Sequence, residues 1–552
     1  MSYYKDIREY LETLDKKGKL RRITRQINKD TELMPLTRLQ FLGLPEKLRT
    51  AFLYDNIVGI KGNHYRGSVA VASLAASREV YAIGLMCRPE EILEKRAQAE
   101  RHPLEPKLVA SGPVQEEVHV GDTLLEHGGL AEFPIPISTP GFDPAPAFTA
   151  PFWITKDPDS GIRNVGTYRV ILKGPAKTGI DFCRPGRGVA IHWNKARERG
   201  KPLPAAIVVG GPPCIGYCSV ADYPIDVDEL TMAGGIAGEP IEIVKCKTVD
   251  LEVPAHAEIV VEGEINTSEL ELEGPFGESI GYMSLTQPRP YFTVKCITHR
   301  KNPVWLCFLS QYQPSESSQI KRLGNCAIVY RHLRYEMGFE KVQKVSMSEL
   351  ADSIYFTVIQ VKKASTDEVW KILEETVKFR PDSKTVIAVD DDIDPDNLDQ
   401  LVWALSMRFQ PHRDIRVKTQ PAYGLTDLSL ATMPELERAR EEHVPKLPTQ
   451  GLLLIDATMK WPYPPVSLPK KEYMDNAIKI WRELGLPDLE LRGPYWGRNL
   501  GYWPEEDEKK AAWAMQGEYF KAGELQATQK RPGGQHFCLW ADKKPKDPGS
   551  KK

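Results

Sequence analysis

Short β-rich runs separated by glycine and proline fill the chain from residue 113 to about residue 330. Strand-like runs begin at Ala205, Glu258 and Tyr291, and the segment Phe133-Pro-Ile-Pro-Ile-Ser-Thr-Pro140 carries three prolines. Many short strands with turn residues between them are typical of a β-barrel or a β-sandwich. The pattern therefore predicts a β-rich domain in the middle of the chain.

The flanking regions combine helices with strands. An amphipathic helix is predicted near the N-terminus, ended by Gly18, from the spacing of Ile7, Tyr10, Leu11 and Leu14. Between residues 331 and 460, helix-like and strand-like patterns alternate. One helix face is predicted from Val369, Ile372, Leu373 and Val377, and a strand-like run follows it at Thr385. Because 552 residues are too many for one core, we predict a mixed α+β and α/β multidomain protein. Its predicted parts are 1–112, 113–330, 331–460 and a C-terminal extension at 461–552.

The extension is rich in tryptophan, proline and charge. Its aromatic segment 493–503 is predicted to form a subunit interface. The alternative is that this segment binds a larger ligand, such as an aromatic acyl-CoA. The lysine-rich end of the chain is predicted to be disordered.

Charge and composition argue against several classes of partner. The 73 basic and 75 acidic residues leave a net charge of −2, so no global field favours nucleic acid or an anionic membrane. No run of 18 apolar residues predicts a membrane span, and the N-terminal segment lacks the apolar core of a signal peptide. The nine cysteines include no CxxC pair. We therefore expect reduced thiols and a cytoplasmic location, with Cys214 and Cys218 as buried or loop thiols.

Two motif-like segments do not support the functions they imitate. The aspartates from Asp390 to Asp396 imitate a calcium loop, but Asn397 and Trp403 stand where the loop needs glycine and glutamate. We predict a strand-to-helix turn there, with Asp396 or Asn397 capping the next helix. The run 210–216 lacks the glycine spacing and the lysine of nucleotide-binding loops, so we expect a turn after a buried strand.

The segment Glu273-Gly-Pro-Phe-Gly-Glu278 carries the clearest chemical signal. A separation of five residues places two carboxylates together on neither a straight strand nor a helix, so only a bent loop can aim both at one point. Two neighbouring carboxyl groups in a partly dry pocket take different pKa values, which suits general acid/base chemistry. The alternative is a Gly-Pro turn with two solvated glutamates.

Several upstream segments join this one in a recognisable set. Asn164-Val-Gly-Thr-Tyr-Arg169, Ile191-His-Trp193 and Asp228-Glu-Leu230 precede Glu273-Gly-Pro-Phe-Gly-Glu278 in the chain. The stretches 251–263, 389–394 and 401–404 add further matches. The set resembles the UbiD family of decarboxylases over roughly residues 5–460. The connection at 181–188 looks longer than is usual in the family.

The resemblance implies a split β-barrel at 113–330 that binds prenylated FMN and an α/β oligomerisation domain at 331–460. It implies a metal held by Asn164, His192 and Glu229. This mixed, fairly hard ligand set suits Mn²⁺ or Mg²⁺, with K⁺ nearby in some members. The cofactor-binding residues implied are Asn164, Thr167, Tyr168, Arg169, His192, Ser219 and Glu229.

The resemblance also implies the reaction, a reversible decarboxylation of an aromatic or α,β-unsaturated acid in which the cofactor acts as electron sink. Its catalytic residues would be Arg169 and Glu273, which form a network, and Glu278, which donates the proton. The implied partners are a flavin prenyltransferase that supplies the cofactor and further copies of the chain in a dimer or hexamer. A non-catalytic flavin-binding subunit and a metal-dependent hydrolase remain as alternatives.

Overall fold

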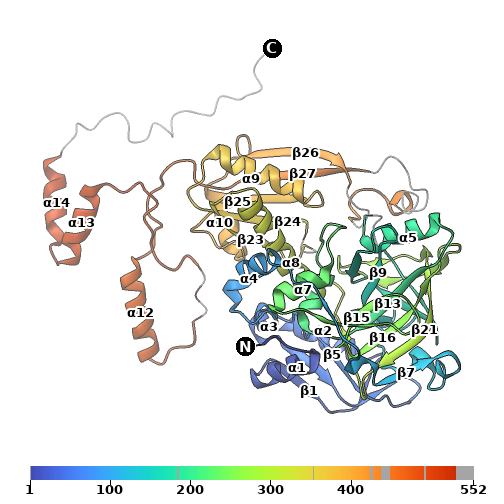
Figure 1. Ribbon diagram of the computed structural model, residues 1–552. Coiled ribbons are helices and arrows are strands. Elements are labelled where there is room, and N and C mark those ends of the chain that lie inside the picture. The colour runs from blue at the N-terminus through green and yellow to red at the C-terminus, as the bar shows by residue number, and fades with distance from the viewer. Residues whose placement is uncertain are drawn as a thin grey trace. The chain divides into compact units, whose positions relative to one another are not determined.

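The computed structural model describes residues 2–182, 186–351, 354–422, 427–436, 448–489, 491 and 493–529. The chain divides into two compact units, residues 1–458 and residues 459–552 (Figure 1). The four-part division at residues 112, 330 and 460 stays a prediction.

The N-terminal segment forms a small sheet covered by helices. Helix α1 (Ile7–Lys16) begins at Asp6, whose side chain caps it, and buries the predicted Ile7, Tyr10, Leu11 and Leu14. The sheet has the order β1 (Leu20–Ile23), β3 (Ala51–Tyr54), β5 (Ser68–Val71) and β22 (Val304–Cys307). Strand β22 comes from far along the chain and pairs in parallel with β5, so the first sheet is completed only by residues beyond 300.

A nine-stranded sheet fills the middle of the chain. Its order is β10 (Arg163–Gly166), β9 (Phe152–Lys156), β13 (Leu203–Val209), β16 (Ile259–Ile265), β21 (Tyr291–His299), β12 (Lys177–Gly179), β11 (Val170–Gly174) and β8 (Ala147–Phe148), with β7 (Glu117–Val120) paired to β21. All of these pairings are antiparallel. The prediction of a β-rich central region with short strands is confirmed.

Helices cover this sheet where the site residues lie. Helix α5 (Gly188–Glu198) packs against β9, β10 and β13, and α6 (Pro213–Ser219) and α7 (Glu229–Ala237) pack against β10. Most of β13 is buried, which agrees with its apolar run Ala205–Val209. Other helices of this unit are α2 (Leu33–Gly43), α3 (Arg78–Gly84), α4 (Ile92–Glu100) and α8 (Glu316–Arg331).

The residues after α8 form an α/β region with its own five-stranded sheet. The sheet order is β23 (Val342–Met347), β24 (Phe356–Val361), β25 (Thr385–Asp390), β27 (Thr449–Asp456) and β26 (Ile415–Pro421), with β24, β25 and β27 parallel. Helix α9 (Thr366–Phe379) packs on β25 and β27 with its predicted face, Val369, Ile372, Leu373 and Val377. Helix α10 (Leu398–Met407) is capped by Asn397, one of the two predicted capping residues. The mixed α+β and α/β fold class is thus confirmed.

The aspartates that imitate a calcium loop pair with cations of the protein. Arg408 donates hydrogen bonds to Asp390 and Asp392, and Asp396 forms ion pairs with Arg78 and Arg322. These ion pairs agree with the rejection of a calcium site.

The second unit contains helices α12 (Lys471–Glu483), α13 (Glu505–Met515) and α14 (Tyr519–Thr528), none of which buries a residue completely. Its exposed apolar side chains include Tyr519 and Phe520, and the predicted interface role of 493–503 stays a prediction. The lysine-rich end predicted to be disordered lies outside the described residues.

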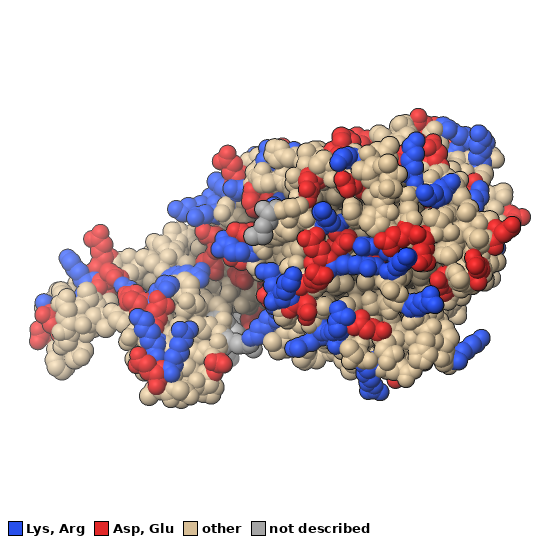
Figure 2. Space-filling view, turned by 60° about the horizontal axis from the view of Figure 1, so that its bottom comes forward, with Lys and Arg blue, Asp and Glu red and all other residues tan. Residues whose placement is uncertain are grey.

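Basic and acidic side chains are interspersed on the face shown in Figure 2, as the nearly balanced charge predicts. The seven cysteines within the described ranges are free thiols, and Cys214 and Cys218 are buried as expected. Among the described residues, no helix combines the length and apolarity needed to cross a membrane.

Candidate active site

The turn between Glu273 and Glu278 is bent in the way its sequence predicts. Glu273 ends β17 (Glu271–Glu273), which pairs with β20 (Gln287–Arg289), and β18 (Phe276–Gly277) pairs with β19 (Met283–Ser284). The Gly274–Pro275 peptide is cis, and Gly274 has φ +101°. A side chain at 274 would be strained by this φ and would lie 3.0 Å from the Leu285 carbonyl oxygen. Glycine therefore allows the turn that brings both glutamates to one side.

Both glutamates contact the guanidinium of Arg169. Arg169 donates to Glu273 through two nitrogens, Nε at 3.3 Å and Nη2 at 2.8 Å, in a bidentate pair. Its Nη1 donates to Glu278 Oε1 and, at 3.0 Å, to Ser284 Oγ. The structure thus brings together the three residues that the sequence predicts to be catalytic. The guanidinium also lies 5.3 Å from the centre of the Phe276 ring, within range of a cation–π contact.

A third carboxylate completes this network, and the sequence did not single it out. Asp181 Oδ2 lies 2.8 Å from Arg169 Nη2, and Asp181 Oδ1 lies 3.0 Å from Arg289 Nε. The only sequence signal was its place at the start of the long connection 181–188. Its link to Arg169 depends on how β11, β12 and β21 pair, which local sequence does not reveal.

Burial differs among the three carboxyl groups. Glu273 and Asp181 are buried, whereas the Glu278 side chain remains 27% exposed. Burial raises the pKa of Glu278; Arg169 opposes this effect, and the nearby charges of Asp181 and Glu273 raise the pKa further. The pKa of Arg169 is lowered by burial but raised more strongly by its three carboxyl partners, so its guanidinium stays charged. The network therefore holds a fixed cation beside one carboxyl group whose pKa is raised by burial.

A cavity of about 470 Å³ lies beside this network. Glu278, Arg169 and Phe276 form part of its wall, together with polar residues of the loops around β10 and α6. The predicted cofactor residues Asn164, Thr167, Tyr168, Ser219 and Glu229 also line it. A cavity of this size with mixed polar and apolar walls is typical of a small-molecule site.

The three predicted metal ligands gather around β10 by different routes. Asn164 lies on β10 opposite Thr155, and the Thr155 hydroxyl is 2.9 Å from His192 Nδ1. Glu229, the first residue of α7, accepts a 2.7 Å hydrogen bond from the backbone nitrogen of Val165. Asn164 thus lies on β10, Glu229 contacts its neighbour Val165, and His192 contacts Thr155 on the adjacent strand β9.

The residues present fit a bound cation. His192 Nε2 is buried and has no hydrogen-bond partner among the described residues, which is unusual for a buried polar atom. Burial lowers the pKa of His192 to about 4, so the ring is neutral at pH 7 and able to bind a metal. A Cβ added to Gly188 would lie 1.9 Å from Asn164 Oδ1, so glycine leaves that oxygen room at the start of α5.

The remaining predicted residues hold the cavity wall together. Thr167 donates its backbone N–H to the Ser219 carbonyl oxygen at 2.8 Å, and the two hydroxyls are 2.9 Å apart. Tyr168 accepts a hydrogen bond from Asn164 Nδ2 at 3.4 Å. Arg187, which precedes α5 and pairs with Asp222, also lines the cavity and was not predicted.

Sequence comparison gives two matching family models. Residues 107–312 match the Rift-related domain of 3-octaprenyl-4-hydroxybenzoate carboxy-lyase, and residues 320–430 match the C-terminal domain of the same enzyme. A phenolic acid decarboxylase of Bacillus subtilis is 31% identical over 427 residues, which is 74% of this chain and 86% of that protein.

Solved structures give the same picture. HmfF from Pelotomaculum thermopropionicum, described as a UbiD-class enzyme in complex with prFMN, superposes with a TM-score of 0.73 at 29% identity, covering 86% of this chain and all of that one (100%). Vanillic acid decarboxylase from Sedimentibacter hydroxybenzoicus gives 0.72 at 25% identity, covering 88% of this chain and 99% of that one.

Proposed function

Because the chain belongs to the UbiD family of carboxy-lyases, we propose that it catalyses the reversible, non-oxidative decarboxylation of an aromatic or α,β-unsaturated carboxylic acid. The observation that carries this proposal is the position of Arg169. It contacts Glu273, Glu278 and Asp181 at once, at the wall of the 470 Å³ cavity.

Glu278 is the proposed proton donor. Of the three carboxyl groups that contact Arg169, it alone lines the cavity. Glu273 accepts two hydrogen bonds from Arg169, and Asp181 forms ion pairs with both Arg169 and Arg289. Glu278 has a single contact to the guanidinium, and burial raises its pKa. A carboxylic acid in this position can protonate the carbon that CO₂ leaves.

Arg169 is proposed to attract the substrate carboxylate through its positive charge. Its N–H groups are already directed at Glu273, Glu278, Asp181 and Ser284, and the buried Glu273 fixes the plane of the guanidinium. The charge is therefore held in one place at the cavity wall, which favours an oriented complex.

The cavity is the proposed site of prenylated FMN, which when bound supplies an electron sink for the cleavage of the C–CO₂ bond. Thr167, Tyr168 and Ser219 would contact the cofactor, and Arg187 stands at the cavity wall before α5. Asn164, His192 and Glu229 would hold Mn²⁺ or Mg²⁺, with K⁺ as a further cation, against the cofactor phosphate. An amide oxygen, an imidazole and a carboxylate form a ligand set that leaves positions for a phosphate oxygen and water.

Apolar residues in the cavity wall favour a planar substrate. Phe276, Phe308 and Ile320 are among the residues that line the cavity, as are Ser310 and Ser317. We propose a free aromatic acid, in line with the phenolic acid decarboxylase relative, and keep an aromatic acyl-CoA as the alternative. We further propose a cytoplasmic homo-oligomer that associates through residues 331–460 and obtains its cofactor from a flavin prenyltransferase. The free thiols of the described cysteines support a reducing compartment.

The test is to produce the protein together with a flavin prenyltransferase. We expect coloured protein that releases prenylated FMN on denaturation and liberates CO₂ from members of a panel of aromatic acids and their CoA thioesters. Labelled bicarbonate should exchange into the same acids. Colourless protein with hydrolytic activity would refute the proposal in favour of a metal-dependent hydrolase, and coloured protein without exchange would favour a non-catalytic subunit.

A further inference from the structure

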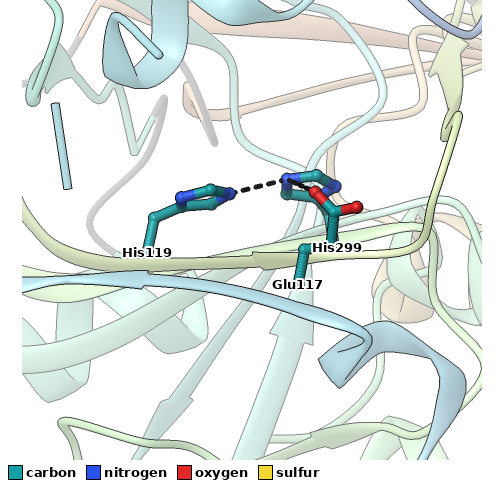
Figure 3. A group of neighbouring side chains, drawn as sticks. All are labelled: Glu117, His119 and His299. Carbon is teal, nitrogen blue, oxygen red and sulfur yellow. Dashed lines mark hydrogen bonds and ion pairs between the residues drawn. The ribbon is translucent and has the colours of Figure 1, made fainter. Parts of the chain in front are cut away.

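A second group of metal-ligating side chains lies where β7 pairs with β21 (Figure 3). Glu117 and His119 belong to β7, and His299 is the last residue of β21. None of them is among the residues that line the 470 Å³ cavity. The group is therefore separate from the candidate active site.

Strand register places the three side chains on one face. Glu117 is directly opposite His299, and His119 is opposite Ile297. Residues two apart on a strand share a face, and directly opposite residues share it as well. Accordingly, His119 Nε2 lies 3.1 Å from His299 Nε2, and Glu117 Oε2 lies 3.7 Å from the same nitrogen. Figure 3 shows both rings and the carboxylate converging on one point.

The backbone prepares His299 as a ligand. Its Nδ1 lies 2.9 Å from the carbonyl oxygen of Arg300. A carbonyl oxygen can only accept, so Nδ1 carries the proton, and in the neutral ring the lone pair is on Nε2, which faces His119 and Glu117. Metal-binding histidines commonly have their other nitrogen hydrogen-bonded in this way, since the bond fixes tautomer and ring orientation.

The surroundings hold His299 in place. His299 and His119 are buried, and the Phe133 ring meets the His299 ring edge-on at 5.4 Å. In the loop after β7, the exposed Glu126 and His127 form a separate group with His119, in which the ligand atoms lie within 4.8 Å of one another.

We propose that Glu117, His119 and His299 bind a divalent first-row transition metal, with Zn²⁺ as the best fit, completed by water. Two imidazoles and one carboxylate are ligands that Zn²⁺ takes at about 2.0–2.1 Å. At tetrahedral angles these bond lengths put two nitrogens roughly 3.3 Å apart, close to the 3.1 Å observed. Binding requires only that His119 move its ring proton to Nδ1. The ion would fasten β7 to β21, because its ligands come from both strands.

The test uses the full-length protein stripped of metal with a chelator and titrated with Zn²⁺ against a chromophoric competitor. We expect Glu117→Gln and His119→Gln to lose one equivalent of bound zinc or to bind it at least about 100-fold more weakly, since even indirect partners of a ligand contribute 10–100-fold. The matched control is His256→Gln, because His256 also pairs with a single glutamate, Glu242, at 3.1 Å. It should keep this equivalent. His192→Gln should keep it as well, which separates this site from the proposed cavity metal.

Equal zinc stoichiometry and affinity in Glu117→Gln and the unmodified protein would overturn the proposal. A measurement without substitutions provides a second check. Crystals grown with Zn²⁺ should show an anomalous peak between His119 and His299 at the zinc absorption edge. No peak there at saturating zinc would equally refute the site, whatever the variants do.

Discussion

Replacing Glu278 by glutamine removes the proposed proton donor while leaving the site nearly unchanged in shape. The amide oxygen of glutamine can accept the hydrogen bond that Arg169 Nη1 donates to Glu278. Arg169 keeps Glu273 and Asp181 as charged partners, so no buried cation is left uncompensated. We therefore expect Glu278→Gln to fold and to bind the cofactor.

The expected loss of activity follows from the position of Glu278. A positioned general acid contributes about 10²–10⁴-fold to a rate, which corresponds to roughly 3–5 kcal/mol of transition-state stabilisation. Glu273 and Asp181 contact Arg169 but do not line the cavity, so neither can take over the proton transfer. We expect kcat to fall by on the order of 10³-fold or more.

The assay measures CO₂ release at saturating substrate, using an acid identified with the panel, and deuterium incorporation into the product in D₂O. Flavin absorbance gives the cofactor content of each preparation. The matched control is Glu271→Gln, on the same strand β17, where Glu271 pairs with Lys173 at 3.0 Å near the surface. This variant should retain full activity.

The pH profile gives an independent check on the same residue. Glu278 must be protonated to act, so the kcat of the unmodified enzyme should fall as pH rises through its raised pKa. Glu278→Gln should lack that decline. Turnover within about threefold of the unmodified enzyme, at equal flavin content, would refute the assignment of Glu278 as proton donor.

Three further substitutions test other parts of the structure. Asp181→Asn removes a negative charge that raises the pKa of Glu278, so the decline of kcat at high pH should move to lower pH. A decline at the same or a higher pH would contradict the proposed effect of Asp181 on the pKa of Glu278. Gly188→Ala places a Cβ 1.9 Å from Asn164 Oδ1 and should weaken Mn²⁺ binding about 10-fold or more. Gly186→Ala, whose Cβ meets nothing within 4 Å, should leave Mn²⁺ binding unchanged. Equal Mn²⁺ affinities of the two variants in equilibrium dialysis would exclude the predicted metal site. Glu316→Gln should lower the free energy of unfolding in urea by about 2–4 kcal/mol. The carboxylate of Glu316 accepts hydrogen bonds from the backbone nitrogens of Ala72, Leu74, Ala75 and Leu309. The NH₂ group of a glutamine would face two of these donors. Glu264→Gln, at a partly exposed ion pair with Lys295, should change that free energy by less than about 0.5 kcal/mol, and a similar loss in both variants would contradict the explanation.

The sequence predicted those features that depend only on residues close together along the chain. Helix α1 and the buried face of α9 follow from apolar spacing, and the turn at Gly274 follows from residues that allow a positive φ. The contact of Glu273 and Glu278 with Arg169 did not follow from local sequence, which left a turn with two solvated glutamates open; the network of Arg169 was implied by the family resemblance.

Features that depend on strand pairing were not predicted. Asp181 joins Arg169 only because the central sheet brings their segments together, and nothing near Asp181 in the sequence specifies that contact. Likewise, Glu117 and His299 are opposite each other only in the observed register of β7 and β21. A shift of β7 by one residue would turn the side chain of His119 to the other face of the sheet.

The pairing of β22 with β5 has a consequence for synthesis of the protein. Ser68 on β5 meets Val304 on β22, so the apolar edge formed by Val69, Ala70 and Val71 has no strand partner until some ~240 more residues have been translated, roughly 10–50 s on a ribosome. An uncovered apolar strand edge is a template for aggregation during that interval. We expect nascent chains shorter than about 310 residues to depend on chaperones, and slower translation to lower the yield of active enzyme.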